Sequence, residues 1–199
     1  MVNSAKKPNI AWVVIQLANP VFVFVVVLMP IAALIYAMTF GSITSLNYVH
    51  IMTGAVWTGI DLFMGIVIGP VLGGTDPQTR ATVFRRLIPR MTFLMPVLAT
   101  ITLTSGIKLA EIMRGITVFN LFASPLQPWI IAAAVIAFIL TVQGFGVMLP
   151  NEVRIFRQLL SETPDIEKIS RLGMRNAKLG GIQGLLQVAI ILIMANIRF

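Results

Sequence analysis

Four residues in one apolar stretch of the chain have the side chains or the spacing that chemistry requires. His50, Gly54, Trp57 and Asp61 stand at positions i, i+4, i+7 and i+11, a spacing that places them on one face of a helix. A face turned to lipid does not tolerate an aspartate, so this face is expected to point into protein. The stretch holds the only histidine of the chain, and it is the first candidate for a binding or proton-transfer site.

His50 allows three interpretations: a ligand of haem iron or copper, a proton relay, or a polar anchor at the membrane interface. For a haem, Gly54 would leave room for the flat macrocycle and Trp57 would stack on it. Otherwise Trp57 fills space in the core. With one histidine in the chain, the second axial ligand would be Met, Lys, water or nothing. The methionines expected at a suitable depth are Met38, Met113 and Met194.

Asp61 is expected near the membrane midplane, where an ionised carboxylate is energetically costly. It should therefore be protonated, paired, or turned towards a wet cavity. By depth, Gln143 and Gln187 are possible partners. The alternative interpretation is a neutral aspartic acid that joins two helices by a hydrogen bond.

Other charged residues extend the candidate site in two directions. Lys108 and Glu111 stand one helical turn apart and are expected at the same outer level as His50. The three residues could therefore form a cluster, in which Lys108 would contact the cofactor. A basic segment follows the span that carries Asp61. Its arginines could hold a haem propionate or an anionic headgroup, although the positive-inside rule also explains them: Arg85, Arg86 and Arg90.

The composition is that of an integral membrane protein in contact with a lipid bilayer. The chain is 57% hydrophobic and 11% charged, whereas about a quarter of residues are charged in soluble proteins. The net charge of +8 is explained by basic cytoplasmic loops rather than by nucleic acid. The chain has no cysteine, which excludes disulfides, thiolate zinc, iron–sulfur clusters and c-type haem. A single histidine excludes a bis-histidine haem within one chain.

Long uncharged runs predict an all-α, polytopic helix bundle with five transmembrane helices in a single domain over residues 1–199. The spans are expected at about 10–40, 47–72, 91–112, 129–149 and 179–197. The first span contains Pro20 and Pro30 and is expected as one kinked helix rather than two. The fifth span opens with Gly180 and Gly181, and such small residues favour close helix packing.

Two polar segments connect the spans on the basic side. In the segment 73–90, Thr75 or Asp76 is expected to cap a short helix that has Pro77 in its first turn. The segment 151–178 is expected to form an amphipathic cytoplasmic hairpin, with its turn at Thr163, Pro164 and Asp165.

The distribution of charge predicts the orientation in the membrane. With the N-terminus inside, only Lys108, Arg114 and Arg198 lie outside. The positive-inside rule thus predicts a multi-pass protein of the plasma membrane with the N-terminus inside and the C-terminus outside. The basic residues then placed in the cytoplasm are Lys6, Lys7, Arg80, Arg85, Arg86, Arg90, Arg154, Arg157, Lys168, Arg171, Arg175 and Lys178.

The spacing of His50, Trp57 and Gly59 (His-x6-Trp-x-Gly) resembles a pattern of small polytopic membrane families. These are the copper-resistance-D-like proteins, the integral membrane family DUF2269 and, more weakly, the haem-containing protoporphyrinogen oxidases of the HemJ type. An arginine-bearing loop and a span with Pro96 and Gly106 follow in the same order. The resemblance implies that His50 is a haem or metal ligand and Trp57 its companion. The fourth span lacks the lysine of the HemJ-type Trp-x-x-x-Lys-Leu pattern, which speaks against protoporphyrinogen oxidation and leaves haem binding open.

Three functions are consistent with the sequence. The leading hypothesis is a redox-associated protein that binds one haem b through His50, with no catalytic residue assigned. The second is a non-catalytic subunit, in a homo-oligomer or a larger membrane complex, because the loops are short and the fifth helix is lined with glycine. The third is conduction of copper or protons through His50 and Asp61.

Overall fold

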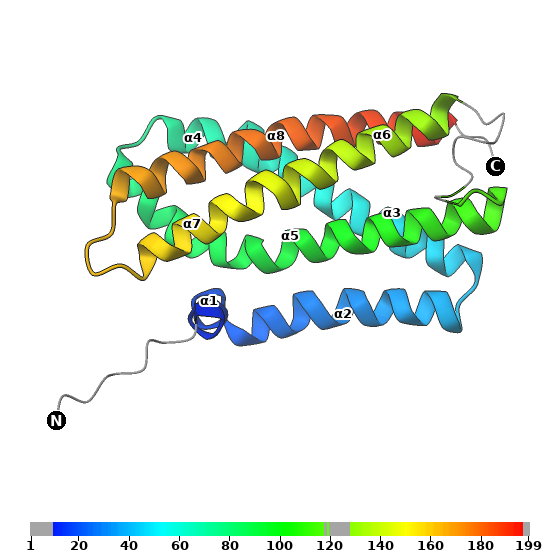
Figure 1. The fold of residues 1–199 in the computed structure, drawn as a ribbon, viewed down its shortest axis with the longest axis horizontal. Helices are drawn as coiled ribbons and strands as arrows, with labels where there is room; N and C mark the ends of the chain where they lie inside the picture. Colours follow the sequence, from blue (N-terminus) through cyan, green and yellow to red (C-terminus); the bar gives the residue numbers. More distant parts are fainter. Residues whose placement is uncertain (1–9, 118, 120–127, 197–199) are drawn as a thin grey trace.

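A computed structural model describes residues 10–117, 119 and 128–196, which form a bundle of long helices (Figure 1). This confirms the expected all-α fold. Among the described residues, five helical spans are long and apolar enough to cross a membrane. The elements, in chain order, are α1 (Ile10–Ala18), α2 (Pro20–Thr39), α3 (Ile43–Leu62), the π-helical segment η1 (Phe63–Ile68), α4 (Gly69–Gly73), α5 (Pro77–Arg114), α6 (Pro128–Gln143), the π-helical segment η2 (Gly144–Met148), α7 (Leu149–Leu159) and α8 (Ile166–Asn196).

Helix α8 lies at the centre of the contacts, because it packs against α3, η1, α4, α5, α6 and α7. Figure 1 shows α3, α5, the α6–α7 rod and α8 running side by side, with α2 along the outside. Helix α2 contacts α3 and α5 and buries only Ala37. Four spans therefore build the interior of the bundle, and α2 presents most of its apolar surface outwards.

The first span is not the single kinked helix that the sequence suggested. The chain breaks at Asn19, which has a φ of 75°, a backbone conformation that asparagine adopts more readily than most residues. The Asn19 side chain accepts a hydrogen bond from the backbone N–H of Val21 at 3.0 Å and caps α2, with Pro20 in the first turn. The expected helix over 10–40 is therefore two helices. Of these, α2 alone has the 20 residues that a crossing requires.

The basic segment 73–90 is not a separate short helix. Its residues open α5, one helix of 38 residues that runs on through Pro89 and Pro96. Asp76, rather than Thr75, is the cap: its carboxylate accepts from the backbone N–H groups of Gln78 and Thr79 at 2.9 and 3.0 Å. The hydrogen bonds from Thr79, more than those from Gln78, lower the pKa of the exposed Asp76 carboxyl.

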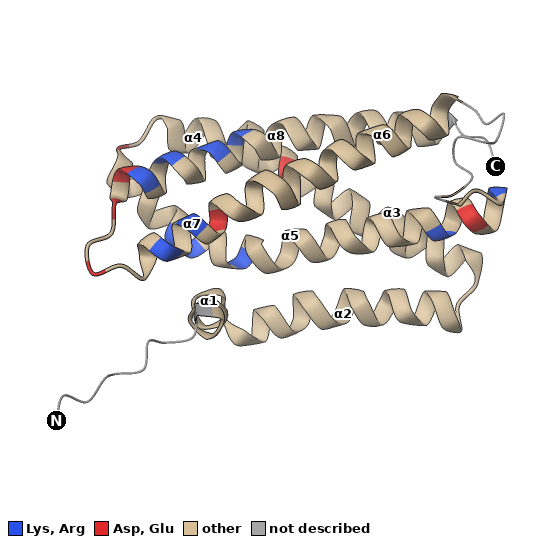
Figure 2. Ribbon diagram, viewed as in Figure 1, with Lys and Arg blue, Asp and Glu red and all other residues tan. Residues whose placement is uncertain are grey.

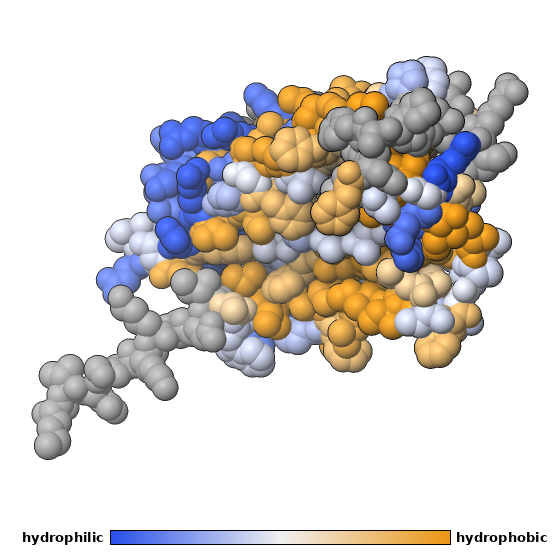
Figure 3. All heavy atoms as spheres, turned by 45° about the vertical axis from the view of Figure 1, so that its right-hand side comes forward, coloured by the Kyte–Doolittle hydropathy of each residue, from blue (hydrophilic) through white to orange (hydrophobic). Residues whose placement is uncertain are grey.

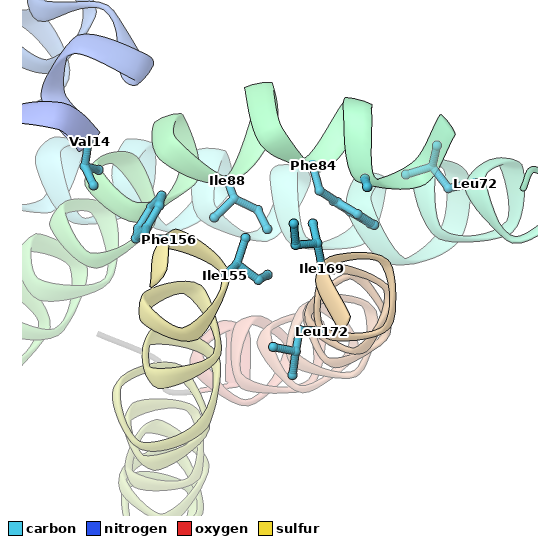
Figure 4. Packing of buried hydrophobic residues seen from close by; sticks show 9 residues of the cluster. Val14, Leu72, Phe84, Ile88, Ile155, Phe156, Ile169 and Leu172 are labelled. Carbon is cyan, nitrogen blue, oxygen red and sulfur yellow. The ribbon is translucent and has the colours of Figure 1, made fainter. Parts of the chain in front are cut away.

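The two arms of the expected cytoplasmic hairpin are likewise the ends of transmembrane rods. Helix α7 continues α6 through η2, and α8 begins at Ile166, directly after the expected turn. These arms pack into the largest apolar cluster of the bundle (Figure 4), so the segment 151–178 is part of the bundle itself. The buried members of that cluster are Val14, Leu72, Ala81, Phe84, Ile88, Ile155, Phe156, Ile169 and Leu172.

Both π-helical segments end two residues before a proline. Segment η1 ends at Ile68 ahead of Pro70, and η2 ends at Met148 ahead of Pro150. A proline inside a helix lacks an N–H group, and its ring clashes with the carbonyl four residues earlier. A local widening into a π turn relieves this clash. As a result, both rods are irregular at similar places along their length.

Glycines allow η1 and α8 to touch at the backbone. A Cβ atom on Gly181 would lie 2.9 Å from the Cα atom of Gly65, and one on Gly184 would lie 2.8 Å from the Leu62 side chain. Small residues at such crossings let membrane helices approach closely. The expectation that Gly180 and Gly181 favour close packing is confirmed.

Charged residues gather mainly at one end of the bundle, where α7, α8 and the start of α5 meet (Figure 2). A smaller charged group lies at the other end, around Lys108, Glu111 and Arg114 at the end of α5. Figure 3 shows a broad hydrophobic zone between the two ends. We call the first of these the basic end.

We predict that Gly181→Ala destabilises the bundle while Gly59→Ala does not. The new methyl group on Gly181 meets the Gly65 backbone, whereas nothing lies within 4 Å of a Cβ on Gly59. Overpacking of this kind costs about 1–3 kcal/mol. Thermal unfolding of the two detergent-purified variants measures the difference, and equal midpoints would contradict the close crossing.

Candidate functional site

Asp61 lies inside the bundle at the end of α3, next to η1, and is 1% exposed. Its Oδ2 atom accepts a hydrogen bond from Gln187 Nε2 on α8 at 2.9 Å, and the Trp57 side chain hydrogen-bonds the same carboxyl. Of the two expected partners, Gln187 is thus confirmed, whereas Gln143 donates to the Leu179 carbonyl at 2.8 Å. Gly180 has no side chain and therefore leaves space beside the acid. A Cβ atom at position 180 would lie only 3.3 Å from Asp61 Oδ1.

Asp61 borders a cavity of about 70 Å³ between α3, α5, the α6–α7 rod and α8. One buried water needs roughly 10–15 Å³, so the cavity holds a few water molecules. Most of the lining is apolar, and no Lys, Arg or His contributes to it. Its polar side chains are those of Asp61, Thr141, Glu152, Asn176 and Gln183.

Glu152 is a second acid on this cavity, and sequence reasoning missed it. It is 8% exposed, and its Oε2 atom accepts a hydrogen bond from Thr92 Oγ1 of α5 at 2.6 Å. In the expected amphipathic cytoplasmic hairpin over 151–178, an acid at position 152 would need no explanation. One signal could have found it: Glu152 shares a helical face with Ile155 and Phe156 at i+3 and i+4, the apolar face of α7.

Two asparagines fix the wall of the cavity at η2. Asn151 Nδ2 donates to Asn176 Oδ1 at 2.9 Å, and Asn176 Nδ2 donates to the Met148 carbonyl at 3.0 Å. Both side chains are buried. Arg154 Nη1 reaches Asn151 Oδ1 from the surface at 3.3 Å. This chain of bonds connects an exposed arginine to a carbonyl of the π turn.

Two glutamine oxygens beside Asp61 lack hydrogen-bond donors. Gln183 Oε1 and Gln187 Oε1 are buried and unpartnered, and Gln183 lines the cavity. Buried acceptors are almost always paired with protein or ordered water. Because Asp61 is itself an acceptor when ionised, this cluster has more acceptors than donors. Water in the cavity would supply the missing donors, so the arrangement favours a hydrated cavity.

His50 belongs to a separate polar cluster nearer the other end of the bundle. Its Nδ1 atom donates to the Thr102 carbonyl at 2.9 Å and also contacts Ser105 Oγ at 3.2 Å. A carbonyl only accepts, so the proton is on Nδ1 and the lone pair is on Nε2. Thr102 Oγ1 donates to Thr53 Oγ1 at 2.9 Å in the same cluster. His50 stands 11 positions from Asp61, about 16 Å along the helix.

The residues around His50 do not build the expected haem pocket. A Cβ on Gly54 would lie 3.3 Å from Thr102 Cγ2, so Thr102 fills the space intended for the macrocycle. A Cβ on Gly106 would lie 2.8 Å from the imidazole ring, which packs closely on α5. Trp57 is buried in another cluster, with Leu98, Ala99 and Leu140. One feature is typical of a metal-ligating histidine: the ring is oriented so that its Nδ1–H group donates a hydrogen bond to a backbone carbonyl.

The charged residues expected near His50 also lie elsewhere or pair among themselves. Lys108 Nζ forms an ion pair with Glu111 Oε2 at 2.9 Å, and both side chains are well exposed. Among the described residues, no hydrogen bond or ion pair joins either of them to His50. The three candidate arginines lie at the basic end. Arg90 is 12 positions from Thr102, about 18 Å along α5, so a contact between these arginines and a haem propionate stays a prediction.

Compared with models of known protein families, with curated proteins and with solved structures, the chain matches none of them. The resemblance to the copper-resistance-D-like, DUF2269 and HemJ-type proteins therefore stays a hypothesis that rests on the spacing of His50, Trp57 and Gly59. Within the part of the chain that the structure describes, no three His, Cys, Asp or Glu residues gather as a metal site.

Haem binding through His50 stays a prediction, and an optical spectrum tests it. Because Thr102 and the close packing of the imidazole on α5 fill the space around His50 among the described residues, we expect the purified protein to lack a Soret band that depends on His50. Oxidised and dithionite-reduced spectra of the wild type and of His50→Ala measure this. A Soret band that is present in the wild type and lost in His50→Ala would contradict the expectation and establish the haem ligand.

Proposed function

We propose that this chain moves protons within a membrane, with Asp61 and Glu152 as the groups that take up and release them. One observation carries the proposal: two buried carboxyl groups line the same cavity, and no cationic side chain lines it. Buried acids inside membrane spans are energetically costly and mark ion or proton pathways. A purely structural acid would need only its hydrogen-bond partner, and it would not need a second acid on the same cavity.

The size of the cavity favours protons over a larger substrate. Sites for small organic molecules occupy roughly 300–1,000 Å³, whereas this cavity has about 70 Å³. Water molecules fit there, and the unpartnered oxygens of Gln183 and Gln187 accept hydrogen bonds from them. A short chain of water between two carboxyl groups is sufficient to transfer protons.

The order of the groups along the bundle suggests the direction of the path. Glu152 lies in α7 at the basic end, next to Thr92, and Asp61 lies deeper. Protons from the cytoplasm would reach Glu152 first and pass through the cavity water to Asp61. The orientation follows from the positive-inside rule, and the plasma membrane location is part of this proposal.

An apolar layer separates Asp61 from the His50 cluster. Trp57, Leu98 and Leu140 are buried there and pack together. Trp57 lies in this layer and also hydrogen-bonds Asp61. A change in the protonation of Asp61 therefore alters a contact of Trp57, the residue that blocks the path. The proposed function therefore includes a closed barrier at Trp57, with His50, Thr53 and Thr102 as the polar group beyond it.

We predict that Asp61→Asn abolishes proton flux and that Glu152→Gln lowers it. The amide cannot take up a proton, and loss of a proton-transfer group reduces rates by roughly 100-fold. The loss at Glu152 is smaller, because water near the basic end bypasses it. Flux into proteoliposomes containing a trapped pH-sensitive dye, driven by a potassium diffusion potential, measures both.

Glu162→Gln is the matched control for this experiment. Glu162 is exposed in the turn between α7 and α8, at the same end as Glu152, and it touches neither cavity nor acid. This variant should keep the wild-type flux. Undiminished flux in Asp61→Asn, or wild-type vesicles no more permeable than empty ones, would overturn the proposal.

We further predict that Trp57→Ala increases passive proton leak, whereas Trp57→Phe keeps it low. Alanine opens the layer between Asp61 and His50, and phenylalanine preserves most of the bulk that packs on Leu98 and Leu140. The same dye, without an imposed potential, records the leak after a small pH step. Equal leak in the two variants, both folded by circular dichroism, would contradict a barrier at Trp57.

A further inference from the structure

A shallow, open groove lies on the outer surface of the α6–α7 rod, separate from the internal cavity except that Phe145 and Leu149 line both. It has a volume of about 350 Å³ and crosses from η2 into α7. Four of its six lining residues are apolar and two are basic. Its residues are Phe145, Leu149, Pro150, Val153, Arg154 and Arg157.

The apolar and basic residues of the groove meet at Val153 and Arg154. Phe145 and Val153 are exposed apolar side chains, and Arg154 and Arg157 lie one and four residues after Val153, towards the basic end. Arg154 donates one hydrogen bond to Asn151 and keeps other N–H groups available. Within the described part of the chain, Arg157 forms no ion pair. Two exposed guanidinium groups at i and i+3 suit a single phosphate group.

The depth of the groove matches the boundary between lipid tails and headgroups. Phe145 is 17 positions from Pro128, where α6 begins, and Arg154 is 26 positions from it. At 1.5 Å per residue these are about 26 and 39 Å, on either side of the roughly 30 Å that the hydrocarbon core spans. Phe145 is therefore within the tails, whereas Val153, next to Arg154 in the chain, is with the arginines at headgroup level.

We propose that this groove binds an anionic phospholipid, with an acyl chain along Phe145 and Leu149 and the headgroup beside Val153, its phosphate on Arg154 and Arg157. The positive-inside rule explains basic residues at this end, but it does not explain why two of them border an apolar groove at the depth of a headgroup. Basic pockets of this kind on the cytoplasmic side recognise anionic headgroups. Arg85 and Arg86 are exposed at the same end on α5 and are not part of the groove.

The bound lipid would lie against the wall of the internal cavity. Phe145 and Leu149 line both the groove and the cavity. Arg154 also reaches the η2 carbonyl of Met148 through Asn151 and Asn176. The lipid thus stabilises η2 and α7 from outside, whether or not the cavity conducts protons.

Lipid retention of the purified full-length protein tests this inference. Native mass spectrometry after titration with phosphatidylglycerol or phosphatidylcholine counts bound lipids for the wild type, Arg157→Gln, the pair Arg154→Gln with Arg157→Gln, and the control pair Arg85→Gln with Arg86→Gln. Each groove arginine is expected to contribute about fivefold in affinity for the anionic lipid. The control pair removes the same charge from the same end and should leave the affinity unchanged.

Val153→Trp tests the apolar half without changing charge. The larger side chain fills the groove from an exposed position, so phosphatidylglycerol retention should fall as it does in the arginine variants. Retention that is unchanged in both Arg157→Gln and Val153→Trp would overturn the proposal. Equal loss in the groove pair and the control pair would also overturn it, because it would indicate attraction by total charge. Thermal unfolding in phosphatidylcholine confirms that each variant is folded.

Discussion

The backbone contact between η1 and α8 is the constraint on which the rest of the interior depends. Gly65 and Gly181 meet without side chains between them, and this sets both the distance and the rotation of the two helices. Asp61 stands one turn before Gly65, so the contact brings it to Gln187 and to the open space beside Gly180. In a bilayer the helices gain little from burying apolar surface, and close packing with polar pairing holds them together. The acid and the glycines are therefore parts of one arrangement.

The two π turns and their prolines give the bundle its irregular interior. In a regular helix, successive side chains are rotated about the axis by a constant angle. The wider turns at η1 and η2 change this rotation next to Asp61 and Asn151. Asn176 pairs with the Met148 carbonyl in η2. The space between the four inner spans is polar on one side and apolar on the other. That combination is suited to a few water molecules and unsuited to a large cofactor.

The basic end combines three features that are usually considered separately. The apolar cluster around Phe84 and Ile155 fixes the ends of α5, α7 and α8. Glu152 is buried among these helices, and the lipid groove lies on the outer face of the same α7. Helix α7 has one face in the apolar cluster and another towards the membrane. The surface arginines and the buried Glu152 therefore lie on the same helix, and a movement of α7 at the arginines also moves Glu152. This links the membrane surface to the proposed proton path.

The sequence by itself determined what depends on composition along the chain. It determined the all-α fold, the five spans, the cap region before Pro77 and the depth at which Gln187 could meet Asp61. Only the tertiary structure decided what depends on rotation between helices. Spans that are apolar on every face carry no strong signal of which side is buried, so Glu152, the filled space at Gly54 and the separation of Trp57 from His50 could not be predicted from their spacing. The continuation of α6 into α7 also depended on contacts with other helices, whereas the break at Asn19 is local, because the Asn19 side chain caps α2 ahead of Pro20.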